Sequence, residues 1–92
     1  MMVNEAIRIM RARAPVVTCG AAATWRIGKI RFKCIEAVTL MVTDKGKFDI
    51  TVSCRDGAAL DSRTVVGLDD IELAPDCPDT LRKMIYKENE NA

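Results

Sequence analysis

The sequence contains no histidine, and this absence excludes more functions than any other feature of its composition. Ser-His-Asp and Cys-His catalytic arrangements need an imidazole as general base, and histidine-ligated metal centres need it as a ligand. The glycine-rich patterns G-x-x-x-x-G-K-[ST] and G-x-G-x-x-G are also missing, so no phosphate-binding loop is expected. We therefore expect a protein that is not an enzyme and that needs no cofactor.

The chain also lacks any C-x-x-C pair, although it has four cysteines, Cys19, Cys34, Cys54 and Cys77. Without such pairs, and without histidine, a zinc site is not expected. Cys34 and Cys54 instead fall in the apolar register of two predicted strands, and free cysteine is among the residues most often buried. We expect reduced thiols in the core and no metal.

Long apolar runs are absent, so the sequence predicts neither a transmembrane helix nor the apolar part of a secretory signal. A cytoplasmic location is the expectation that follows. Hydrophobic residues make up 49% of the chain and charged residues 29%, which is typical of a globular domain. At 92 residues the chain has room for one modest core. We expect a single domain over residues 1–87 and a disordered polar tail over residues 88–92.

Alternation between apolar and polar residues organises the segment from Thr24 to Arg55. Strands are expected on both sides of a turn at residues 44–47, with Gly46 in the left-handed conformation. Phe32 and Phe48 both fall in the inward-facing register. Apart from Glu36, residues 35–43 are apolar or β-branched on both faces, which predicts a central strand covered on both sides.

A helix is expected at the start of the chain, from Asn4 as N-cap to Arg13, with Pro15 ending it. Its apolar residues form one continuous stripe, but Ile9 lies off that stripe. Near the other end of the chain, residues 65–73 have the pattern of a strand, a tight polar turn of 3-10 type and a closing strand. A short final helix is expected from the apolar spacing around residues 81–85.

Together these elements predict an α+β fold with a helix at each end. The strands form either an antiparallel meander sheet or a small five-stranded barrel of SH3-like or OB-like type. The barrel types rest on an analogy of strand count and turn placement.

Positive charge gathers in the first half of the chain. Residues 1–47 carry nine Lys and Arg against three acids, whereas residues 48–92 carry five against ten, so the halves have net charges of +6 and −5. The candidate binding residues are a basic strand face with the hairpin tip, and two arginines of the first helix: Arg26, Lys29, Arg31, Lys33, Lys45 and Lys47, with Arg8 and Arg11. The alternatives are a solvated face, an edge strand protected by its charges, and an amphipathic helix that only covers the sheet.

The favoured hypothesis is a non-enzymatic regulator or inhibitor that docks on a protein or ribonucleoprotein complex through this basic surface. In size and style the chain is similar to small accessory proteins of phages and other mobile elements. A second hypothesis is a small barrel that binds a nucleic acid backbone directly. Few aromatic residues are present, at 4% of the chain, and only Trp25 is expected at an exposed strand start, so base stacking is poorly supported. A third hypothesis is a structural subunit that self-associates through an open sheet edge.

Overall fold

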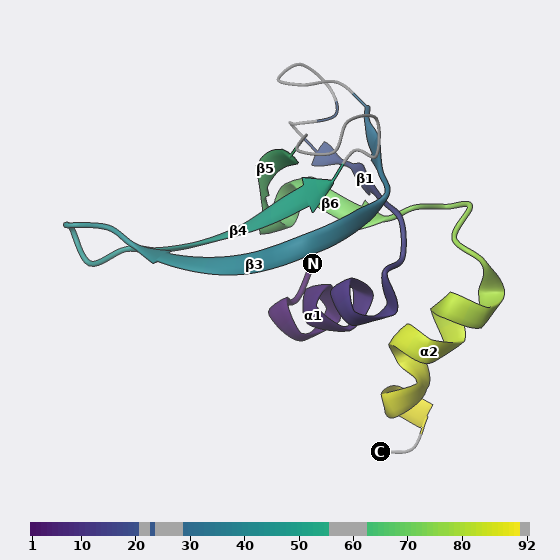
Figure 1. Cartoon of the computed structure of the whole chain (residues 1–92). Coiled ribbons are helices and arrows are strands. Elements are labelled where there is room, and N and C mark those ends of the chain that lie inside the picture. The colour runs from purple at the N-terminus through teal and green to yellow at the C-terminus, as the bar shows by residue number, and fades with distance from the viewer. Residues whose placement is uncertain (21–22, 24–28, 56–62, 91–92) are drawn as a thin grey trace.

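The computed structural model describes residues 1–20, 23, 29–55 and 63–90. Its elements lie along the chain in the order helix, strands, 3-10 helix, strand and helix (Figure 1). Their bounds are α1 Val3–Ala12, β1 Val16–Thr18, β2 Arg31–Phe32, β3 Cys34–Val42, β4 Phe48–Arg55, β5 Arg63–Gly67, the 3-10 helix Leu68–Asp70, β6 Ile71–Leu73 and α2 Asp79–Glu90.

The described strands form two antiparallel three-stranded sheets and no closed barrel (Figure 1). One sheet has the order β2-β1-β6 and the other has the order β3-β4-β5. Only Lys33 separates β2 from β3, so the chain passes from the first sheet to the second at a bend there. The expected α+β class is confirmed, whereas neither the single meander sheet nor the five-stranded SH3-like or OB-like barrel is.

β3 is an edge strand of its sheet, and not the covered central strand that its apolar sequence predicts. Val38 lies opposite Val52 and Leu40 opposite Ile50 in the register with β4, so the predicted division of β3 into two faces is correct. The burial is different because α1 lies beside one face only, next to Val38 and Leu40. On the other face, Thr39 is among the exposed residues.

α1 begins earlier than expected, with its N-cap at Met2, two residues before Asn4, and without a side-chain capping hydrogen bond. At its other end, Arg13 adopts the left-handed conformation with φ 55°. The Arg13 N–H donates to the Met10 carbonyl, and the Ala14 N–H donates to the Ile9 carbonyl, at 3.1 and 3.2 Å. This pair of bonds satisfies the last carbonyls of the helix in the manner of a Schellman motif.

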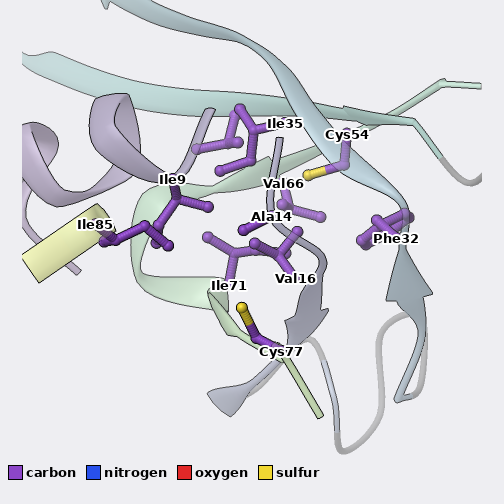
Figure 2. Packing of buried hydrophobic residues seen from close by; sticks show 11 residues of the cluster. Ile9, Ala14, Val16, Phe32, Ile35, Cys54, Val66, Ile71, Cys77 and Ile85 are labelled. Atoms are coloured by element: carbon purple, nitrogen blue, oxygen red, sulfur yellow. The ribbon is translucent and has the colours of Figure 1, made fainter. Parts of the chain in front are cut away.

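The core lies between the two sheets and the two helices, and its members come from every part of the described chain (Figure 2). Ile9, the residue off the predicted stripe, is fully buried, because α2 packs on that side of α1 and contributes the buried Ile85. Cys54 is fully buried as expected, whereas Cys34 is only half-buried. All four cysteines are free thiols.

The end of the chain follows the sequence pattern closely. The 3-10 helix precedes β6, in which Ile71 is buried and Leu73 packs against the core. Asp69 is solvated, with its side chain 95% exposed. α2 continues to Glu90, so residues 88–90 are helical where the sequence predicts a disordered tail.

Candidate protein-binding surface

The predicted basic strand residues lie at two distant places in the fold. Lys29, Arg31 and Lys33 are exposed and lie in or next to the short strand β2, on either side of the buried Phe32. Arg31 is partly neutralised there, because its Nε lies 3.3 Å from a carboxylate oxygen of Asp76.

The two lysines of the hairpin tip do not join these cations. Lys45 and Lys47 are exposed at the far end of β3, and this strand of nine residues spans about 30 Å. Figure 1 shows the tip projecting away from the rest of the molecule. Arg26, like Trp25, lies outside the described residues.

The first-helix arginines belong to the side of the molecule on which α1 meets the hairpin. Arg11 is exposed and lines a groove between α1 and the β3–β4 hairpin. Arg8 is half-buried and lies with Arg11 beside Met84 of α2, an exposed apolar side chain. Arg11 therefore lies beside the hairpin.

The feature that sequence reasoning missed is an exposed apolar surface on the far half of the hairpin. We define the hairpin surface as Leu40, Val42 and Phe48 on one face of the sheet together with Met41 on the other, with exposed fractions of 59%, 59%, 72% and 50%. Val42 lies directly opposite Phe48 in the ladder. Phe48 keeps the register expected of an inward residue, but the hairpin extends beyond the core at that point (Figure 1). Gly46 closes the turn with φ 75°, as expected.

A groove of about 460 Å³ adjoins the hairpin surface. Its described lining consists of six apolar residues and one arginine: Val3, Ile7, Met10, Arg11, Val38, Leu40 and Ile50. Leu40 belongs to both features, so the groove and the hairpin surface are continuous. Large contiguous apolar areas on a folded protein mark sites of interaction with another molecule.

A second depression, of about 560 Å³, lies at the opposite end of β3, where the strand bulges between Ile35 and Ala37. Glu36 dominates its chemistry, because one carboxylate oxygen lies 2.6 Å from Arg55 and the other 2.7 Å from Arg63. These two ion pairs tie β3 to β4 and β5. One carboxylate bridges two guanidiniums, so Glu36 acts as a structural clamp between three strands, while the cluster keeps a net positive charge.

The buried thiol of Cys54 is poorly suited to nucleophilic chemistry. Burial raises its pKa to about 12, with a smaller contribution from the neighbouring Cys34. A thiol reacts as its thiolate, so a raised pKa keeps Cys54 in the unreactive form at neutral pH.

The comparisons with known proteins give no family for this chain. It matches no protein-family model, and searches of curated proteins and of solved structures find no significant match. Among the residues that the structure describes, no helix is long and apolar enough to cross a membrane. The candidate site therefore rests on the exposure and register of the hairpin surface. Its sequence signal is the uncharged run 37–42, which belongs to the segment 35–43 that the sequence predicts as a strand covered on both sides.

Proposed function

We propose that the protein is a non-enzymatic regulator or inhibitor that docks on a protein or ribonucleoprotein complex through the hairpin surface. The observation that carries the proposal is the exposure of Leu40, Met41, Val42 and Phe48 at the end of a projecting hairpin. Burying apolar side chains against a partner is favourable by about 25 cal/mol per Å² of apolar area removed from water. A large aromatic residue such as Phe48 is a suitable anchor for such an interface.

Exposed positively charged side chains lie next to the hairpin surface. Lys45 and Lys47 lie at its tip, and Arg11 lines the adjoining groove. Such charges contribute mainly to the rate and orientation of encounter, while desolvated apolar contacts hold the complex. Lys29 and Lys33 remain candidates for a separate, weaker contact at the other end of the molecule.

We also propose that the two sheets are an SH3-like arrangement. Residues 31–42 run through both sheets with a single bend at Lys33, and a 3-10 helix lies between β5 and the closing strand β6. This connectivity supports the SH3-like alternative over the OB-like one. Function is still argued from the surface, because one fold serves many functions.

The test is affinity capture from a cell lysate with tagged protein, with and without nuclease. The variant Leu40→Ser/Phe48→Ser should lose the bound partner in both conditions, because it removes the apolar anchors. The matched control is Val65→Ser, since Val65 is 64% exposed but lies on β5, at the other edge of the same sheet. Full recovery of the same partner by the double variant would refute the role of the hairpin surface.

The nucleic-acid alternative predicts a different pattern in the same experiment. Recovery would then depend on intact nucleic acid, would fall steeply with salt, and would be lost in Lys29→Glu/Arg31→Glu/Lys33→Glu. The ion pair between Arg31 and Asp76 weakens this alternative, because it partly neutralises the central cation of the row.

A further inference from the structure

The edge of β3 is open beyond the part that lies beside α1. β3 ends the strand order β3-β4-β5, and its residues Thr39–Val42 are exposed. This stretch carries no charge and no proline. Natural proteins usually protect such edges with lysine, proline, a bulge or a covering element, because unpaired N–H and C=O groups recruit another strand. The bulge at Ile35 and Ala37 lies too far along β3 to protect this end.

The hydrogen bonds of the hairpin identify which backbone groups face the open edge. The Thr43 N–H donates to the Lys47 carbonyl at 2.9 Å. In an antiparallel ladder, residues that bond to the neighbouring strand alternate with residues that do not. Thr39 and Met41 therefore bond to β4, whereas the N–H and C=O groups of Leu40 and Val42 point away from it.

We infer that the molecule occupying this edge is a second copy of the same chain. The inference rests on the proposed binding role of the hairpin surface and names its occupant. The two β3 strands pair antiparallel about a two-fold axis at Met41, so that two three-stranded sheets become one of six strands. Leu40 of one copy then exchanges hydrogen bonds with Val42 of the other.

Charge supports a self-complementary pairing. The turn carries Asp44, Lys45 and Lys47, and an antiparallel pairing about Met41 places the two turns at opposite ends of the shared edge, so their lysines do not meet. The register places Asp44 of one copy level with Val38 of the other, beside the groove that Arg11 lines. A carboxylate thereby approaches an exposed guanidinium in each half of the symmetric interface.

The exposed apolar side chains beside the edge also suit a symmetric partner. A stable interface buries about 800 Å² on each side, more than the backbone edge of one added peptide strand supplies. A second copy adds its own hairpin surface. On one face Leu40 becomes the neighbour of Val42 from the other copy, and on the opposite face the two Met41 side chains meet.

Amide hydrogen exchange, measured by NMR at about 20 µM and at about 1 mM protein, tests this pairing residue by residue. The amides of Leu40 and Val42 should become protected only at the higher concentration. Those of Thr39 and Met41 should be protected at both, because β4 binds them within one copy.

Sedimentation of matched variants is the second test of the β3 pairing. Val42→Lys places a charge on the open edge and should weaken self-association by about tenfold or more. Val65→Lys places the same charge at 64% exposure on the opposite edge strand and should leave it unchanged.

A chain that stays monomeric at about 1 mM, with Leu40 and Val42 amides exchanging fast, would overturn the inference. Equal weakening by both lysine variants would also overturn it. If lysate capture still depended on Leu40 and Phe48, the proposed function would stand with a different protein as occupant. If neither self-association nor capture depended on them, both proposals would fail.

Discussion

The two halves of the β3–β4 hairpin have the same alternating sequence pattern and opposite surroundings. In the near half, Ile35, Val52 and Cys54 are 3%, 0% and 0% exposed. In the far half, Leu40 and Phe48 occupy the same face of the same ladder and are 59% and 72% exposed. The helices and the second sheet cover the first group, whereas the hairpin extends beyond them in its far half (Figure 1), with Leu40 at the boundary beside α1.

This difference in exposure shows that the apolar side chains of one hairpin have two roles. In the near half they are removed from water when the chain folds, so they stabilise the native state. In the far half they remain in water in the monomer and add little to its stability. These side chains can instead be buried in an interface with another molecule.

The largest effect is expected from shortening a covered side chain. Phe32 is 1% exposed and lies in the core cluster (Figure 2). Phe32→Ala should lower the free energy of unfolding by about 3–5 kcal/mol, through lost burial and the cavity left behind. Urea unfolding followed by circular dichroism measures this loss. A loss below about 1 kcal/mol would show that this core is not packed as described.

The sequence predicts the parts of this fold that depend on local pattern. The register of β3 with β4, the left-handed Gly46 and the 3-10 turn before Ile71 all follow from periodicity and turn preference. Each of these features is fixed by residues close together in the chain.

The features that the sequence does not predict depend on contacts between elements that are far apart in the chain. Ile9 lies off the predicted apolar stripe of the first helix. Its burial depends on contact with α2, which follows some seventy residues later in the chain. The sequence predicts a covered strand over residues 35–43, but the composition of the run 37–42 suits an unprotected edge equally well. The strand order decides between these, and periodicity carries no information about it. For the same reason, the hairpin surface could not be recognised from sequence.

The near half also gives the protein a pH dependence through Cys54. Its pKa is raised to about 12 by burial, whereas the unfolded thiol ionises near its usual value of 9.0. The unfolded state therefore loses a proton first, and this contribution to stability is complete below pH 9 and is lost as the pH rises from 9 towards 12. The slope should be roughly 1 kcal/mol per pH unit in that range.

Cys54→Ala isolates this effect from the titration of lysine and tyrosine. The variant should be less stable than the parent at pH 7 because it leaves a small cavity. The deficit should shrink as the pH rises above 9. A deficit that stays constant up to pH 11 would contradict the raised pKa.

A smaller effect is expected at the bulge end of β3. Glu36 is 19% exposed and pairs with Arg55 and Arg63, so Glu36→Ala should cost about 1 kcal/mol of unfolding free energy. The matched control is Asp76→Ala, which removes an ion pair between side chains that are 53% and 65% exposed. The control should cost less than about 0.5 kcal/mol, and both effects should decrease in high salt. Equal losses in the two variants would argue against a structural clamp at Glu36.

The most direct test of the account is urea unfolding of Phe48→Ala beside Phe32→Ala, at a protein concentration low enough to keep the chain monomeric. Both variants remove the same side chain, from positions that are 72% and 1% exposed. The account predicts a change within about 0.5 kcal/mol for Phe48→Ala, because its ring stays in water in the monomer. A loss of about 2 kcal/mol or more would mean that Phe48 belongs to the core of the monomer and would contradict the assignment of the far half of the hairpin to binding.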